Sequence, residues 1–290
     1  MNFIEALNVI FKYKTYSENQ ETPEEKTVLK DVSFSINQGD FVGILGHNGS
    51  GKSTLARHLT ALLKPSGGAV YIRLGMDTSN PKETIAIRKT AGIVFQNPDN
   101  QIIGNIVEED VAFGPENLGV PTEEIWERIA MALEATGMTA YRESSPGALS
   151  GGQKQKVAIS GILAMEPECI VLDEPTAMLD PSGRREVLEA IHRLNKEKNI
   201  TIIYITHHID EVENADYLYV MNQGELVLQG TPDEIWKESE TSEKLEQYGI
   251  PLPFDKKLIQ LLRNGGMKIP DDIRSEQMLL DYLTDKLEID

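Results

Sequence analysis

The sequence has a single cysteine among its 290 residues, Cys169. One thiol cannot form a disulfide within the chain, and this favours a reducing compartment. Cys169 lies in the short apolar run 169–172, so we interpret it as a small core residue rather than a reactive thiol. A disulfide framework within the chain is therefore excluded.

Long hydrophobic runs are missing as well. No apolar run reaches the roughly 18 residues that a membrane-spanning helix needs. The first residues, 1–6, lack the basic and apolar regions of a signal peptide. We therefore expect a cytoplasmic protein, in which any crossing of a membrane is done by other chains.

Positive charge is scarce. The chain has 28 lysines and arginines against 46 aspartates and glutamates, a formal net charge of −18 at pH 7. Non-specific binding to nucleic acid needs a basic face, so we predict no nucleic-acid partner. We interpret the excess negative charge as a surface that repels copies of itself. The length is enough for one large domain and a smaller one.

The most informative stretch that is present is a predicted phosphate-binding loop. Residues 41–45 form an apolar run typical of a buried strand, and the next eight residues fit the spacing G-x-x-x-x-G-K-[ST]. Residues 54–63 follow with apolar positions at helical spacing. The glycines let backbone N–H groups turn toward phosphate oxygens, and the helix directs its positive dipole end to the same place. We therefore predict a nucleoside triphosphate site formed by Gly46, His47, Asn48, Gly49, Ser50, Gly51, Lys52, Ser53 and Thr54.

The rest of the chain alternates strands and helices. Residues 3–12 and 28–36 predict two half-buried antiparallel strands, with Tyr13 at the end of the first and a polar hairpin loop at 14–26. Further strands are predicted at 69–72, 92–95, 169–173, 201–206, 217–220 and 225–229, and helices at 85–89, 182–196 and 233–237. This order favours an α/β fold: a P-loop NTPase core with a mostly parallel sheet and an N-terminal antiparallel β subdomain.

Two helical parts are predicted beside this core. The apolar periods at 107–113 and 125–135, joined through Gly114-Pro115 and residues 119–121, indicate an inserted α-helical subdomain at about 97–160 of a domain that covers 1–230. Beyond it, periods around 258–262 and 278–283 indicate a small C-terminal helical appendage, residues 231–290. The appendage either packs on its own domain or associates with another copy.

Polar residues follow several of the predicted core strands. Gln96, the pair Asp173-Glu174 and His207 each come directly at or after a strand end, as the phosphate-binding loop does. In a parallel sheet these ends share the edge where ligands bind. A strand-end histidine alone is usually structural, but four aligned polar ends are hard to explain by packing. We predict Ser53, Gln96 and Asp173 as Mg²⁺ ligands and Glu174, His207 and Gln96 as catalytic residues, with Glu174 as the general base.

The stretch Leu149-Ser-Gly-Gly-Gln153 resembles the signature motif of the ATP-binding-cassette (ABC) ATPases, and the resemblance spans about 3–230. It implies an ATP hydrolase in which Tyr13 stacks on adenine, Gln96 is the glutamine of the Q-loop and Asp180 is the last residue of the D-loop, 177–180. Residues 46–54 match Walker A, 169–174 match Walker B with the catalytic glutamate, and His207 matches the switch histidine. His208 departs from the family, where an acidic residue is usual, and this leaves the local hydrogen bonding open.

The signature residues also have a physical interpretation. Ser150 can cap the following helix, and the N–H groups of Gly151 and Gly152 form a second anion-binding helix terminus. The resemblance implies that Leu149, Ser150, Gly151, Gly152 and Gln153 close over the ATP of a facing subunit. A second homologous ATPase, identical or not, is therefore the predicted partner, with two ATP molecules between the two chains.

Residues 95–103 and 107–117, together with the appendage, resemble the first of the two ATPases in an energy-coupling factor (ECF-type) transporter. This implies a peripheral protein on the cytoplasmic face of the cell membrane, with a membrane coupling subunit and a substrate-binding membrane subunit as partners. It would energise uptake of vitamins or transition-metal ions. The alternatives are a homodimeric ATPase of a cobalt or nickel importer, a soluble ABC ATPase acting on DNA or ribosomes, and a non-hydrolysing nucleotide sensor. The acidic composition disfavours the second, and Glu174 with His207 disfavours the third.

Overall fold

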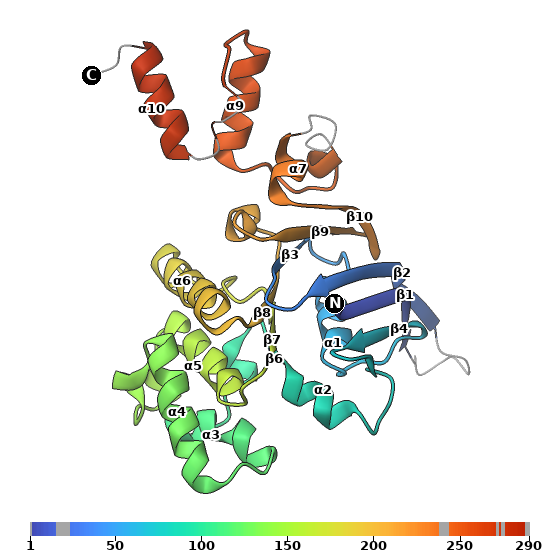
Figure 1. The fold of residues 1–290 in the computed structure, drawn as a ribbon, viewed down its shortest axis with the longest axis vertical. Helices are drawn as coiled ribbons and strands as arrows, with labels where there is room; N and C mark the ends of the chain where they lie inside the picture. The colour runs from blue at the N-terminus through green and yellow to red at the C-terminus, as the bar shows by residue number, and fades with distance from the viewer. Residues whose placement is uncertain (1, 16–23, 238–243, 271–272, 274–275, 288–290) are drawn as a thin grey trace.

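The N-terminal strands form an antiparallel sheet beside a larger, mostly parallel one (Figure 1). The computed structural model describes residues 2–15, 24–237, 244–270, 273 and 276–287. The antiparallel sheet has the order β2-β1-β4-β5, with β1 (Asn2–Thr15), β2 (Glu24–Asn37), β4 (Gly67–Ile72) and β5 (Met76–Asp77).

The hairpin loop predicted at 14–26 is too long at both ends, because residues 14–15 and 24–26 belong to strands. The β1–β2 ladder continues past Tyr13, pairing Lys14 with Glu25 and Thr15 with Glu24. Charge explains the extension, because Lys12 and Lys14 lie 3.1 Å and 3.6 Å from carboxylate oxygens of Glu25 across the ladder. The remainder of the predicted loop, 16–23, lies outside the described residues.

The second sheet has the order β10-β9-β3-β8-β7-β6. Its strands are β3 (Phe41–Leu45), β6 (Ala91–Val94), β7 (Cys169–Asp173), β8 (Thr201–Thr206), β9 (Tyr217–Asn222) and β10 (Glu225–Gly230). Only β10 pairs antiparallel in this sheet, because Gln223 and Gly224, both at positive φ, turn the chain back after β9. The carboxyl ends of β3, β6, β7 and β8 therefore share one edge, as predicted.

Each face of the parallel sheet packs on a different layer. Val42 and Ile44 belong to a core with α1 (Lys52–Leu59) and the antiparallel sheet. Phe41 and Leu45, on the opposite face, pack with α5 (Gly151–Leu163) and α6 (Pro181–Lys198). The alternation of side chains along β3 therefore places the phosphate-binding loop between two covered faces.

The helix after the loop is shorter than predicted, since α1 ends at Leu59 and not at residue 63. Ala61 adopts a left-handed conformation with φ 52°. The N–H groups of Leu62 and Leu63 then donate back to the Arg57 carbonyl at 2.8 Å and 3.0 Å. These bonds close the helix end as a left-handed cap does, although the apolar period continues.

The predicted helical subdomain contains α3 (Val107–Asn117), α4 (Thr122–Thr136) and the first part of α5, around a core that includes Val111, Ile129 and Val157. Gly114-Pro115 was predicted as a connection, and this is wrong, because both residues lie inside α3. A Cβ at Gly114 would lie 2.7 Å from Cγ of Met165, so glycine allows this close packing. The short helices η1 (Pro98–Asn100), η2 (Thr139–Tyr141) and η3 (Pro146–Ala148) also lie in this subdomain, whereas α2 (Thr84–Thr90) precedes it and η4 (Ile209–Val212) follows β8.

The C-terminal part contains α7 (Pro232–Lys237), α9 (Phe254–Asn264) and α10 (Glu276–Leu287). Ile235, Trp236 and Leu252 pack on the main core, whereas Ile259 and Leu279 belong to a small separate cluster. The helices α9 and α10 stand beyond α7 at one end of the molecule (Figure 1). The division at residue 230 stays a prediction, since packing joins residues up to Leu252 to the main core.

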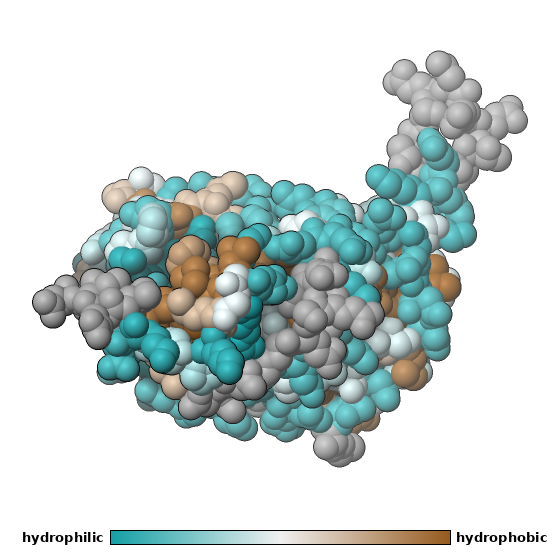
Figure 2. All heavy atoms as spheres, turned by 90° about the horizontal axis from the view of Figure 1, so that it is seen from above, coloured by the Kyte–Doolittle hydropathy of each residue, from teal (hydrophilic) through white to brown (hydrophobic). Residues whose placement is uncertain are grey.

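The surface at this end is mostly hydrophilic, with a hydrophobic patch near the middle of the face (Figure 2). Among the described residues, no helix has both the length and the apolar composition that crossing a membrane requires.

Candidate active site

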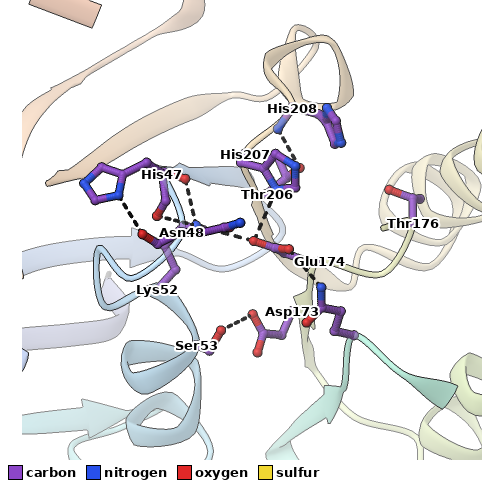
Figure 3. Close-up of polar contacts among 12 residues, drawn as sticks. His47, Asn48, Lys52, Ser53, Asp173, Glu174, Thr176, Thr206, His207 and His208 are labelled. Atoms are coloured by element: carbon purple, nitrogen blue, oxygen red, sulfur yellow. Dashed lines mark hydrogen bonds and ion pairs between the residues drawn. The ribbon is translucent and has the colours of Figure 1, made fainter. Parts of the chain in front are cut away.

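Side chains from four strand ends meet at the carboxyl edge of the parallel sheet (Figure 3). Lys52 begins α1 after β3, Gln96 follows β6, Glu174 follows β7 and His207 follows β8. All four strands end at this edge because they run parallel. The structure therefore brings together these four of the residues that the sequence analysis singled out.

The loop between β3 and α1 has the backbone of an anion cradle. Gly49 and Gly51 have φ of 83° and 105°, conformations that other residues rarely adopt. Ser50 Oγ is buried and has no hydrogen-bond partner among the described residues. The His47 ring bridges Asn48 O at 2.7 Å and Asn222 Oδ1 at 2.9 Å. Glycine geometry and an unpaired buried hydroxyl both fit a phosphate group.

Lys52 is the buried cation of the site, with 4% of the residue exposed. Its Nζ donates to the carbonyls of Gly46 and His47 at 2.7 Å and 3.1 Å, and lies 3.4 Å from Glu174 Oε1. Burial lowers the pKa of Lys52, while the carboxylates of Glu174 and Asp173 oppose that shift. A cation held this way is placed to bind an anion that enters the loop.

Ser53 and Asp173 present two oxygen atoms side by side. The Ser53 hydroxyl donates to Asp173 Oδ1 at 2.9 Å. Burial raises the pKa of Asp173, and the Ser53 hydrogen bond opposes this shift. Hydroxyl and carboxylate oxygens are ligands that Mg²⁺ prefers, so this pair fits the predicted metal. Among the described residues, no hydrogen bond joins Gln96 to either of them.

Glu174 is the point where the other side chains converge. Gln96 Nε2 donates to Glu174 Oε2 at 3.2 Å, and His207 Nδ1 lies 3.4 Å from Oε1. The His207 contact is close but lacks hydrogen-bond geometry, and its Nδ1 has no hydrogen-bond partner within the described chain. Glu174 itself has φ 49°, which turns its side chain out of the line of β7 at a cost of about 1–3 kcal/mol.

Among the described residues, no hydrogen bond or ion pair joins Tyr13, Asp180 or the signature residues 149–153 to this cluster. Tyr13, on β1, packs edge-on against Phe11, which contacts His58 of α1. Ser150 caps α5 by accepting from Gln153 N at 3.3 Å, and Gln153 Oε1 accepts from Ser150 N in return. No hydrogen bond or ion pair in the described part of the chain joins 149–153 to 46–54.

The D-loop lies beside the signature residues of the same chain. Asp180 caps α6 by accepting from Gly183 N at 2.8 Å. A Cβ at Gly152 would lie 3.4 Å from Gly183 Cα, so the starts of α5 and α6 pack closely. The signature residues and the D-loop residue Asp180 therefore lie next to each other, and no hydrogen bond or ion pair in the described part of the chain joins the signature residues to the phosphate-binding loop.

The sequence analysis missed a buried carboxylate next to the site. Glu211 accepts hydrogen bonds from Thr176 and Thr206, which flank Glu174 and His207 in the chain. His208, whose bonding was open, donates its N–H to Thr206 Oγ1 at 2.9 Å, and its ring lies 4.1 Å from that of His207, tilted by 38°. A glutamate four positions after a histidine gives no periodic signal that would have identified it.

Comparison with known proteins agrees with this geometry. Residues 29–177 match the family described as ABC transporter. The chain is 54% identical over 280 residues to the energy-coupling factor transporter ATP-binding protein EcfA1 of Caldanaerobacter subterraneus, covering 97% of this chain and 98% of that protein. It is also 46% identical to the EcfA1 protein of Enterococcus faecalis, covering 97% of this chain and 96% of that protein.

A solved structure of cbiO1 from Clostridium perfringens, described as part of the ABC transporter complex cbiONQ, superposes with TM-score 0.73 at 37% identity, covering 89% of this chain and 99% of that one. The chain therefore belongs to the ABC transporter family of ATPases and, within it, to the energy-coupling factor transporter ATP-binding proteins.

Proposed function

We propose that this chain binds and hydrolyses ATP to drive uptake of a micronutrient through an ECF-type importer. The observation that carries the proposal is the convergence of Lys52, Gln96 and His207 on Glu174 beside the phosphate-binding loop. A merely structural glutamate would not need a cation, an amide and an imidazole around it at an edge where ligands bind.

Each residue of the cluster has a chemical role in this proposal. Lys52 binds the β- and γ-phosphates, and its bonds to Gly46 and His47 keep it at the loop. Glu174 accepts a proton from the attacking water, which Gln96 orients. His207 donates a hydrogen bond to the γ-phosphate. Tyr13 stacks on the adenine.

Ser53 and Asp173 are the residues that would hold Mg²⁺, with Gln96 as a further ligand. The ion supplies positive charge that neutralises the phosphates. The Ser53 hydroxyl donates to Asp173 Oδ1, so the two oxygen atoms lie next to each other. The chain needs few ligands of its own because Mg²⁺ retains several waters.

The signature residues are proposed to act on the ATP of a second ATPase. Their separation from the chain's own loop supports this, as does the joint presentation of Ser150 and Asp180. A dimeric post-hydrolysis structure of the ATP-binding cassette MJ0796, bound to ADP and Pi, superposes with TM-score 0.70 at 30% identity, over 79% of this chain and 98% of that one. We propose a similar pair here, formed with an identical or a homologous chain.

The pair would act on the cytoplasmic face of the membrane, peripherally, with a coupling subunit and a substrate-binding subunit in the bilayer. The names of the EcfA1 relatives support an energy-coupling factor transporter, and we propose vitamins or other micronutrients as its cargo, as the family resemblance implies. The similarity to cbiO1, described as part of the ABC transporter complex cbiONQ, keeps a second ABC transporter candidate open, which we take to be a homodimeric ATPase of a cobalt or nickel importer. Purifying the tagged chain from native membranes and identifying its partners distinguishes the two.

The test of the chemistry is Glu174→Gln, which keeps the shape of the side chain and removes the base. We expect ATP binding to persist and hydrolysis by the assembled complex to fall by about 10²–10⁴-fold. Lys52→Ala is the companion variant, and we expect it to weaken nucleotide binding itself. Turnover near the wild-type rate in Glu174→Gln would overturn the assignment.

A further inference from the structure

Glu211 is a buried carboxylate that the proposed chemistry does not use. It lies on η4 with 3% of the residue exposed. Thr206 Oγ1 donates to its Oε2 at 2.6 Å, and Thr176 Oγ1 donates to its Oε1. Arg184 Nε of α6 lies 3.4 Å from Oε1. A carboxylate with these partners is held in one position, because leaving a buried charge unpaired is costly.

The two hydroxyl donors come from the segments that carry the proposed catalytic residues. Thr176 lies two positions after Glu174, in the loop that leads to α6. Thr206 is the last residue of β8, directly before His207. One carboxylate therefore bridges the strand end of the proposed base and the strand end of the proposed switch histidine.

The Thr206 hydroxyl also fixes the chain on the other side of His207. It donates to Glu211 and accepts from the N–H of His208 at 2.9 Å. The bond from His208 N–H to the Thr206 hydroxyl spans the backbone of His207, and the bond to Glu211 fixes that hydroxyl in turn. Hydrogen bonds to an ionised acceptor are about twice as strong as those between neutral groups, so the carboxylate of Glu211 holds the Thr206 hydroxyl more firmly than a neutral side chain would.

We infer that Glu211 is a positioning residue, which sets the His207 side chain relative to Glu174 for ATP hydrolysis. The inference rests on the proposed function, because it requires His207 and Glu174 to act in that reaction. Glu211 touches neither side chain in any hydrogen bond of the described residues, and it acts through Thr206 and Thr176.

The first test compares Glu211→Gln with Asp210→Asn in the full chain, assembled with its ATPase and membrane partners. Asp210 is the exposed neighbour on the same short helix, so its variant makes the same change of charge without the bridge. We expect Glu211→Gln to lower kcat by about 10- to 100-fold, as a small displacement of a catalytic group does. ATP affinity should stay within about twofold, and Asp210→Asn should match the wild type.

The second test asks whether Glu211 acts through His207. We expect His207→Ala to lower kcat, and Glu211→Gln to cause no further fall in that background, since both changes remove one function. Equal falls in both backgrounds would show that Glu211 acts independently of His207, and a loss of ATP affinity as large as the loss of kcat would show a general effect on the site; either result would overturn the inference. If His207→Ala leaves turnover unchanged, the role proposed for His207 fails together with this inference.

A matched pair at Thr206 decides the question if Glu211→Gln does not fold. Thr206→Val removes the hydroxyl at almost constant volume, and Thr206→Ser keeps it. We expect the valine variant to lose kcat at unchanged ATP affinity and the serine variant to retain it. Equal kcat in the two variants overturns the inference.

Discussion

The Ser53 hydroxyl donates to Asp173 Oδ1 at 2.9 Å, although the two residues lie 120 positions apart in the chain. Ser53 lies in the phosphate-binding loop motif at the start of α1, and Asp173 ends β7, the strand next to β8 in the parallel sheet. The fold therefore brings two candidate Mg²⁺ ligands from distant parts of the chain into contact.

Asp173→Asn should raise the Mg²⁺ concentration needed for half-maximal ATP hydrolysis by roughly tenfold or more, because it removes a negative charge from the ion's position. The amide oxygen can still accept from Ser53, so the loop should stay folded. Titrating free Mg²⁺ in the ATPase assay checks this, with Asp281→Asn on α10 as a remote control. Coinciding titration curves for Asp173→Asn and the control would exclude Asp173 as a metal ligand.

Ser150→Asp should disable the ATP site of the facing subunit while the mutant chain's own loop still binds nucleotide. Aspartate caps a helix as serine does, so α5 should keep its N-terminus. Its charge would repel the γ-phosphate across the interface. Ser150→Arg should give the same pattern through bulk, with loss of the cap costing about 1 kcal/mol.

Labelled ATP trapped at each site of mixed wild-type and mutant pairs is the measurement for these variants. Ser150→Thr is the matched control, and we expect it to leave both sites active. The composite-site proposal is wrong if the defect falls only at the mutant chain's own Walker A site.

Much of the site could be predicted because its signals are local. The spacing of glycines and Lys52 is contiguous in the chain, and Gln96, Asp173 and His207 were identified because they follow apolar strands. Parallel pairing then brought these strand ends to one edge. The fold class followed from the same alternation of strands and helices.

What could not be predicted depends on contacts between distant segments. Thr176 and Glu211 are 35 positions apart, and no pattern in either segment announces their hydrogen bond. Gly114 lies inside α3, where the absence of a side chain lets Met165 pack closely, and β1 extends because Glu25 lies across from Lys14. The left-handed backbone of Glu174 is likewise set by tertiary structure, since glutamate has no local preference for it.

Lowering the pH below 6.5 should destabilise the fold through His58. Its ring is fully buried, with Nδ1 2.7 Å from Thr54 O, and burial lowers its pKa from the ordinary value of 6.5. The unfolded chain therefore binds this proton first as the pH falls, so stability is full above pH 6.5 and is lost below it.

Denaturant unfolding of wild type and His58→Asn between pH 5 and pH 8 measures this contribution. Burial lowers the pKa values of His192 and His208 in the same direction, so the difference between the two proteins isolates His58. We expect a shallower pH dependence in His58→Asn. Parallel curves for the two proteins would exclude the effect.

We predict that the segment from Gln96 to α3 passes nucleotide binding on to a membrane partner. Gln101 Oε1 accepts from Phe95 N at 3.1 Å, so the two ends of this turn are tied together. Asp110 Oδ1 accepts from the N–H groups of Ile103 and Gly104, which fastens the turn to α3. Ile103 remains 62% exposed, whereas a residue that only packs the subdomain core would be covered.

Single cysteines at Asn100, Asn105 and Glu109 should therefore form disulfide crosslinks with the membrane coupling subunit, in yields that change when ATP is added. All three positions are exposed along this segment. Cys169→Ala provides the background: burial raises the pKa of Cys169 and the residue is fully covered, so its loss should not alter the surface. Cysteines at Asp31 on β2 and Gln277 on α10 are the controls.

Crosslinks from α10 but from none of the three positions would locate the coupling surface on the appendage instead. If the crosslinks form but their yield does not change with ATP, the segment contacts the membrane partner without moving in response to nucleotide. A surface that drives transport has to move with the nucleotide bound beside Gln96.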